Sequence, residues 1–293
     1  MQSTNVDKAN FDQLWNYNQP GESEARFREY LATVDPYTPA YVELLTQIAR
    51  AQGLQRNFDA AQQTLDEAQK LLTNQMPRAQ IRYLLERGRV YNSASQADQA
   101  RPLFLQAWEQ AVNDGEDFYA VDAAHMLGII ELPEQQLLWN EKALALAEKS
   151  RDPRAQQWLG SLYNNIGWTY HDLQQEETAL ALFEKALVWR LAQGQDREIR
   201  IAKWSVARIL RALHRVEEAL AMQQALHEEW ARSGEVDGYV EEEIGEGLLL
   251  LAQPEQAQAY FATAYRELAK DPWLVAHEAA RLERLRTFGK VEN

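Results

Sequence analysis

The chain has 293 residues, of which 46% are hydrophobic and 25% charged, and its formal net charge is −14 at pH 7. The absence of cysteine excludes disulfides, thiolate nucleophiles and cysteine-based zinc sites, and the acidic charge opposes non-specific attraction to nucleic-acid phosphates and anionic lipids. With only 13 glycines and 9 prolines, the composition predicts a mostly helical protein.

The N-terminal segment carries no targeting signal that we can recognise. Its sequence, MQSTNVDKANFDQLW, lacks a charged lead followed by an apolar run, and no stretch of the chain approaches about 18 apolar residues. We therefore expect a cytoplasmic protein that does not bind membranes. Residues 10–33 have a helical pattern outside the register of the later segments, so we expect residues 1–40 to form an N-terminal helical cap.

From residue 41 onward, small residues recur at a nearly constant spacing. The first series, with intervals of 38–40 residues, comprises Ala49, Gly88, Gly128, Gly167, Ala207 and Gly245. The second series comprises Ala61, Ala100, Ala179, Ala219 and Ala257, and the third comprises Ala68, Ala107, Ala143, Ala186 and Ala264. Such a period indicates an array of helix–turn–helix units. Residues 41–270 accommodate about six of them.

The glycines of the first series lie inside helices, where glycine is destabilising by roughly 0.5–1 kcal/mol relative to alanine. We therefore expect packing to compensate for them. Two antiparallel helices pack about 8–10 Å apart, and the side chains at their crossing set that distance. We expect the small residue of each first helix to face an alanine of the second helix. Aromatic residues such as Phe104 and Phe183 would then fill the space around this contact.

Two parts of the chain depart from the repeat. In the Gly128 unit the first small residue and Ala143 are 15 residues apart instead of 19, which removes about one helical turn. Pro133 marks the shortened connection. Residues 271–288 have the pattern of a terminal helix, so we expect residues 271–293 to form a C-terminal capping helix and tail.

The best copy of the repeat consists of Tyr163, Ile166, Gly167, Tyr170, Ala179, Phe183 and Ala186. A second copy consists of Leu84, Gly88, Tyr91, Ala100, Phe104 and Ala107. This pattern resembles the tetratricopeptide repeat over roughly residues 40–270, and its period, longer than the usual 34 or so, is similar to that of kinesin-light-chain-like and bacterial regulatory members. The resemblance implies an all-α fold, a right-handed superhelical α-solenoid of helical hairpins whose first helices line a concave surface.

The register that the resemblance supplies places a set of ligand-binding side chains on this concave surface. The expected peptide-binding groove comprises Arg50, Arg82, Arg89, His125, Asn164, Asn165, Trp168, His171, Trp204, Arg208 and Arg211. Arginine suits carboxylates, asparagine bonds both backbone groups of an extended peptide, and tryptophan supplies rigid contact area. In similar repeat proteins an asparagine at the position of Asn165 clamps a peptide backbone. The last unit adds Tyr239, Glu242, Glu243 and Glu246 to the same stripe.

The arginines, tryptophans and histidines of this set also have structural alternatives. The arginines can form salt bridges with glutamates of adjacent units and only solubilise the surface. Trp168 and Trp204 equally suit the core between repeats. His125 and His171 come from different units and would need carboxylate partners to hold a metal.

No motif for phosphate binding, dinucleotide binding, metalloprotease or serine-hydrolase chemistry occurs, and no basic arm or helix-turn-helix is evident. We therefore expect no catalytic residue, metal, cofactor or nucleic-acid partner. The leading hypothesis is a protein-interaction scaffold or adaptor that binds an extended peptide segment with acidic character near its middle. The alternatives are a regulatory module that senses a ligand or signalling peptide, and a self-assembling structural protein. The oligomeric state is left open.

Overall fold

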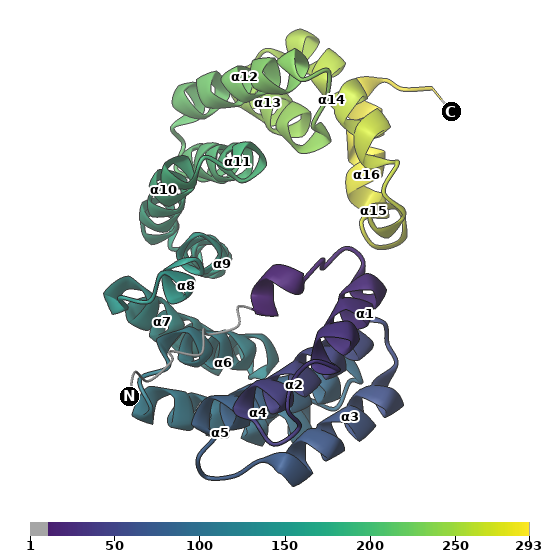
Figure 1. The fold of residues 1–293 in the computed structure, drawn as a ribbon. Coiled ribbons are helices and arrows are strands. Elements are labelled where there is room, and N and C mark those ends of the chain that lie inside the picture. The colour runs from purple at the N-terminus through teal and green to yellow at the C-terminus, as the bar shows by residue number, and fades with distance from the viewer. Residues whose placement is uncertain (1–10, 293) are drawn as a thin grey trace. The chain divides into compact units, whose positions relative to one another are not determined.

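The computed structural model describes residues 11–292, and the chain divides into two compact units, of which unit 1 ends at Trp158 and unit 2 begins at Leu159. Helices make up most of the described residues, and no strand occurs among them (Figure 1). Within this part of the chain, no helix is both long and apolar enough to cross a lipid bilayer. The expected all-α fold of helical hairpins is confirmed.

Unit 1 consists of an N-terminal segment followed by antiparallel hairpins. Its elements are η1 (Phe11–Leu14), α1 (Pro20–Leu31), α2 (Pro39–Leu54) with α3 (Phe58–Leu71), α4 (Pro77–Ser93) with α5 (Ala97–Asn113), α6 (Asp117–Ile130) with α7 (Pro133–Lys149), and α8 (Pro153–Gln156). Helix α1 packs against α2, and α2 against α4. Residues 1–10 of the expected N-terminal cap lie outside the described residues.

Unit 2 repeats the same arrangement. Its elements are α9 (Leu159–Asp172) with α10 (Glu176–Gln193), α11 (Asp196–Ala212) with α12 (Val216–Arg232), α13 (Gly238–Leu250) with α14 (Pro254–Leu268), α15 (Pro272–His277) and α16 (Ala279–Gly289). The sequence predicted one helix over residues 271–288, but the chain forms two. Glu278, with φ −124° and ψ 35°, leaves the helical conformation between them. Helix α16 packs against α14. Residue 293, the end of the expected tail, lies outside the described part.

Local sequence explains where the helices begin. Several start with proline at the first helical position, where the missing N–H costs nothing, as in α2 and α4. Helix α13 begins instead after Asp237, whose carboxylate accepts hydrogen bonds from the backbone N–H groups of Tyr239 and Val240. The starts of α2, α4 and α13 are therefore specified by local sequence.

The turns inside the hairpins follow one rule. Five hairpins have three-residue turns whose middle residue is left-handed, namely Arg56, Ser95, Gln174, His214 and Ala252. In each, the next N–H bonds to the carbonyl five residues earlier, as from Gln253 to Leu248 (2.9 Å). This bond pattern is the Schellman motif that ends a helix and reverses the chain. The α6–α7 connection is shorter, with only Glu131 and Leu132 between the helices.

We expected the glycines of the first series to face alanine, but the atoms nearest to three of them, Gly88, Gly167 and Gly245, belong to a phenylalanine ring of the second helix. A Cβ on Gly167 would lie 2.9 Å from Cζ of Phe183, and one on Gly245 would lie 2.8 Å from Cζ of Phe261. These rings are fully buried. Side chains of a helix lean toward its N-terminus, so the ring rather than the nearby alanine reaches the facing backbone.

Two hairpins place an amide where the others carry this apolar side chain. Gln223 takes the place in α12 that Phe183 takes in α10, and Asn140 lies against Gly128 in the shortened hairpin. Both side chains are buried, and neither Gln223 atom nor Oδ1 of Asn140 has a hydrogen-bond partner in the protein. In these two hairpins, therefore, the core contains buried amide atoms that make no hydrogen bond within the protein.

Candidate functional site

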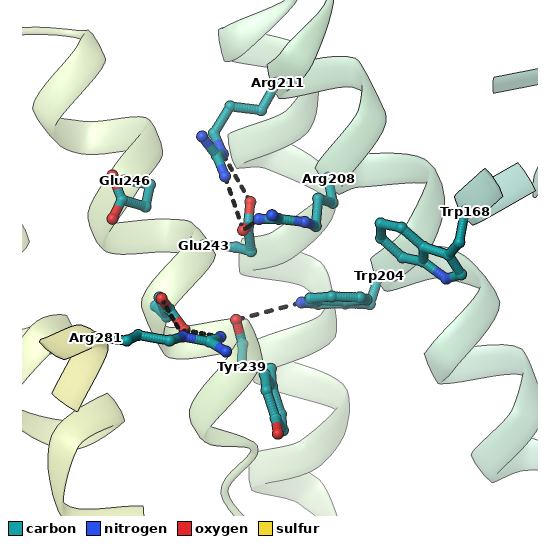
Figure 2. Close-up of a pocket in the computed structure, with 9 residues that line it drawn as sticks. Trp168, Trp204, Arg208, Arg211, Tyr239, Glu243, Glu246 and Arg281 are labelled. Carbon is teal, nitrogen blue, oxygen red and sulfur yellow. Dashed lines mark hydrogen bonds and ion pairs between the residues drawn. The ribbon is translucent and has the colours of Figure 1, made fainter. Parts of the chain in front are cut away.

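A buried glutamate joins two consecutive first helices in unit 2. Arg208 and Arg211 of α11 both reach Glu243 of α13, and Nε of Arg211 lies 2.7 Å from Oε2 of Glu243 (Figure 2). Burial alone would lower the pKa of Arg211, but the hydrogen bond and charge of Glu243 outweigh it and raise that pKa. The two ion pairs to Glu243 therefore hold α11 to α13.

The same helix, α13, is tied to α16 by two further ion pairs. Nε of Arg281 lies 2.9 Å from Oε1 of Glu242, and Arg284 bonds to Glu246. Burial opposes the charge of Arg281, but Glu242 and Glu278 raise its pKa above the ordinary value. Figure 2 shows Arg281 approaching α13 from the side opposite Arg208. Arginines from two helices thus converge on the acidic stripe of α13.

Three aromatic side chains lie beside these ion pairs. The Trp168 and Trp204 rings are 5.7 Å apart, and Trp204 meets Tyr239 edge to face at 6.1 Å. Nε1 of Trp204 donates a hydrogen bond to the backbone carbonyl of Tyr239 (3.3 Å). Trp168 also packs edge-on against Phe183 at 4.9 Å. Each of the two tryptophans therefore packs against the core on one side and is accessible from the surface on the other.

These groups enclose a pocket of about 630 Å³. Its lining comprises Trp168, Trp204, Arg208, Arg211, Tyr239, Glu242, Glu243, Glu246 and Arg281. Three arginines balance three glutamates, so the pocket has no excess charge, and its apolar surface comes from the aromatic rings. We call it the unit 2 pocket.

A smaller pocket of about 120 Å³ borders the same helices α9 and α11. It is lined by Gly160, Ser161, Asn164, Asn165, Ala186, Arg190, Glu198, Ile201 and Ala202. Nη2 of Arg190 lies 3.3 Å from Oγ of Ser161. Burial lowers the pKa of Arg190, and Glu198 only partly offsets this effect. We call it the asparagine pocket.

The remaining expected groove residue of unit 2, His171, lies outside both pockets. Its Nδ1 is 2.7 Å from Oε2 of Glu176, at the start of α10. Among residues 11–292, no three histidine or acidic side chains converge as ligands of a metal ion.

In unit 1 the expected groove residues are largely held in ion pairs. Nη1 of Arg82 lies 3.2 Å from Oε2 of Glu43 and 2.9 Å from the Tyr119 hydroxyl. Arg89 bonds to Glu86 at 2.6 Å and also to Asp122. Only 15% of the Arg89 side chain is exposed, yet both carboxylates together overcome its burial and raise its pKa.

His125 and Arg50 complete the expected set in unit 1. The His125 ring lies 4.9 Å from the Trp158 ring, and burial lowers its pKa. Nη1 of Arg50 is 3.5 Å from Oε1 of Glu86. The guanidinium of Arg50 is also covered by the rings of Trp15 and Tyr17, at 5.6 and 5.4 Å.

The structure therefore gathers Trp168, Trp204, Arg208 and Arg211 in one pocket and Asn164 with Asn165 in another. Sequence reasoning missed Arg281, because residues 271–293 were treated as lying outside the repeat. A signal was present, since Arg281 follows Glu242 by 39 residues, one further period. Trp15 and Tyr17 were also missed, and no periodic signal marks them.

Residues 160–190 match the family model of the tetratricopeptide repeat. The chain carries a tetratricopeptide repeat. This repeat spans most of α9 and α10, which supply Trp168 and the asparagine pair. No curated protein matches the sequence of the chain.

Solved structures share the tetratricopeptide fold at low sequence identity. A signal-transduction ATPase with a tetratricopeptide repeat sensor from Pyrococcus horikoshii is 16% identical, with a TM-score of 0.70 over 92% of this chain. The aligned part is 42% of that protein, so this chain spans about two fifths of its length. These matches establish the fold.

Two further structures align over nearly the whole chain. Aspartyl phosphate phosphatase F from Bacillus subtilis has a TM-score of 0.54 at 14% identity, covering 99% of this chain and 88% of its own. NprR in complex with its cognate peptide NprX has a TM-score of 0.51 at 15% identity, covering 98% and 85%. The NprR structure therefore shows a protein of this fold with a peptide bound to it.

Proposed function

We propose that the chain is a non-catalytic interaction scaffold that binds a short extended segment of a protein partner in the unit 2 pocket. The observation that carries this proposal is the group of three aromatic side chains, Trp168, Trp204 and Tyr239, beside arginines anchored by buried glutamates. Rigid rings give contact area at little entropic cost, and anchored charges give specificity. The cytoplasmic location and the lack of catalysis stay predictions.

Arg208 is the group best placed to meet a ligand carboxylate. It bonds to Glu243 through Nη1, and 33% of its side chain is exposed, whereas Glu243 is nearly buried. A guanidinium has five N–H donors in a planar fork, so the N–H groups that Glu243 leaves unused can donate hydrogen bonds to the carboxylate of a ligand. This supports a ligand with an acidic group near the middle of the bound segment.

The asparagine pocket suits the backbone of the same segment. Asn164 and Trp168 are four residues apart on α9, so they share one face of that helix. The two pockets also share α11. An extended segment that places a side chain between Trp168 and Trp204 would bring its peptide groups past Asn164 and Asn165. NprR, which has a similar fold, binds a peptide, and this supports a peptide as the ligand here.

A sensing role is the second candidate. It is favoured by the structural likeness to the Pyrococcus horikoshii protein, which has a tetratricopeptide repeat sensor. In that case, ligand binding would stabilise unit 2, and above the dissociation constant the unfolding temperature would rise with the logarithm of the ligand concentration.

The proposal is tested by selecting peptides from a random library on the full chain and measuring their affinity for two variants. Tyr239→Ala removes a pocket ring but keeps the backbone carbonyl that bonds to Trp204. We expect it to weaken binding at least tenfold. The matched control, Tyr37→Ala, removes an 82% exposed tyrosine outside the pocket and should leave affinity unchanged. Equal affinity for both variants would contradict the proposal.

A further inference from the structure

Residues 15–17, which precede the hairpins, cover α2, the first helix of the first hairpin in unit 1. Nε1 of Trp15 donates a hydrogen bond to Oε1 of Gln47 (2.9 Å), and the Trp15 and Tyr17 rings stack 4.7 Å apart at 2°. Both rings cover the guanidinium of Arg50. Gln47 and Arg50 lie on α2, three residues apart on one face.

Arg50, which lies under these rings, occupies the same position in its repeat as Arg208 of the unit 2 pocket. Arg50 follows the small residue Ala49 by one position, as Arg208 follows Ala207. Each arginine bonds to a glutamate two residues before the next small residue, Glu86 in unit 1 and Glu243 in unit 2. The repeat thus builds the same anchored arginine twice. Among residues 11–292, the segment that precedes the hairpins covers the arginine of unit 1.

We propose that this surface of unit 1 is a second peptide-binding site, held in cis by residues 15–17, and that a partner segment competes with them. The partner's chemistry follows from the occupant: two aromatic side chains two residues apart, one with an N–H donor for Gln47. Arg50 lies under the two rings, and Arg89 interacts electrostatically with Tyr17. Both arginines are paired with Glu86, so the aromatic rings of a partner rather than its net charge would be recognised.

The contacts of residues 15–17 indicate that part of this segment can move away from α2. Tyr17 is 59% exposed, and residues 15 and 16 have no regular secondary structure. The backbone around Asn16 is tied to α1 rather than to α2, through hydrogen bonds with the Ser23 hydroxyl at 2.7 and 3.1 Å. The Tyr17 ring can therefore lift from Arg50 while Asn16 stays fixed, whereas release of Trp15 also breaks its packing on the core residues Phe27, Leu44 and Ile48.

Trp15 also has a structural contact, which the test must respect. Its ring meets the fully buried Phe27 edge to face at 5.0 Å. Replacing Trp15 by alanine would remove this contact and weaken the packing of α1 on α2. Trp15→Phe retains a ring against Phe27 but loses the indole N–H that bonds to Gln47.

The experiment uses a fluorescent peptide with the sequence of residues 12–18, DQLWNYN, added to the full chain. Anisotropy should show at least tenfold tighter binding to W15A/Y17A than to the unsubstituted chain, whose own segment competes. W15F/Y17A should show the same direction of change and guards against loss of folding in the first variant. Adding Arg50→Ala to either variant should abolish the gain, and the peptide DQLANAN should not bind.

Other outcomes overturn the inference. If neither double variant binds the peptide better than the unsubstituted chain, residues 15–17 are only structural. If Tyr239→Ala removes the binding, the peptide has entered the unit 2 pocket instead. If sedimentation shows a dimer that W15F/Y17A dissociates, the segment is exchanged between copies and does not act in cis. The test is independent of the proposed function, because it does not need a ligand of unit 2.

Discussion

Units 1 and 2 build the same anchored arginine and surround it differently. In unit 1, Arg50 is paired with Glu86 and covered by Trp15 and Tyr17. In unit 2, Arg208 is paired with Glu243, lies 5.9 Å from the Trp204 ring of its own helix, and borders an open pocket. The repeat therefore determines the ion pair, while residues outside the shared pattern determine whether the surface is covered or open.

The largest expected effect comes from removing the carboxylate that anchors each arginine. Glu243→Gln removes the buried negative charge that pairs with Arg208 and Arg211 and leaves one amide oxygen as acceptor. We expect the free energy of unfolding of unit 2 to fall by roughly 2–3 kcal/mol, less than for a fully buried pair because both arginines contact some water. Glu86→Gln should cost about 1 kcal/mol, since Arg89 keeps Asp122 and Arg50 keeps its aromatic cover. Urea unfolding measures both.

The control for this pair is Glu228→Gln, which removes an ion pair with Arg232 whose side chains are about 70% exposed. It should change the free energy of unfolding by less than about 0.5 kcal/mol. A larger loss for Glu86→Gln than for Glu243→Gln would contradict the comparison of the units.

The next effect tests the packing that both units share. Gly245→Ala would place a Cβ 2.8 Å from the Phe261 ring, and we expect it to destabilise unit 2 by about 2 kcal/mol. Gly247→Ala in the same helix meets Leu220 at an ordinary 3.5 Å and should stabilise by up to about 1 kcal/mol. Thermal unfolding should also show a loss for Gly88→Ala in unit 1. Equal effects at positions 245 and 247 would contradict the glycine–phenylalanine contact.

A stabilising substitution is expected where unit 2 buries an amide. Gln223 is 1% exposed with both amide atoms unpartnered, at the place where unit 1 has Leu65 in α3. Gln223→Leu should therefore raise the free energy of unfolding by about 1 kcal/mol. The exposed neighbour provides the control, since Gln224→Leu should change it by less than about 0.5 kcal/mol. A destabilised Gln223→Leu would indicate a bond that the amide makes and leucine cannot.

The smallest expected effect is the contribution of His125, in unit 1, to the pH dependence of the free energy of unfolding. Burial and Arg89 lower the pKa of His125, although Asp122 and Asn140 act in the opposite direction. The unfolded chain then takes up a proton near pH 6.5 while the folded chain does not, so stability falls as pH decreases below about 6.5 and levels off below the folded pKa. His125→Phe keeps a ring against Trp158 and should show a smaller loss of unfolding temperature between pH 7 and 5.5. An unchanged pH slope would exclude His125 as its source.

The sequence was sufficient to predict the hairpins because their cause is periodic. Small residues at intervals of 38–40 mark where two helices cross, and that spacing places α9 against α10 and α13 against α14. The contact itself was predicted wrongly. Periodicity tells which face of a helix is buried, but the direction and length of the Phe183 side chain decide what reaches Gly167.

The site was only partly predictable, for a different reason. The repeat register placed Trp168, Trp204, Arg208 and Arg211 on one stripe, and the structure brings them to one pocket. The repeat register did not predict which glutamate forms an ion pair with each arginine, because this depends on how neighbouring hairpins are rotated relative to each other. Trp15 and Tyr17 have no counterpart one period away, so only the folded structure reveals their contact with Arg50.

Hydrogen–deuterium exchange of the full chain, with and without a peptide selected on it, tests the proposed binding face most directly. We predict slower exchange in α9, α11 and α13, whose side chains line the two pockets, and unchanged exchange in the second helices α12 and α14. Protection that falls on α12 and α14, or on unit 1 alone, would contradict the assignment of the ligand to the unit 2 pocket.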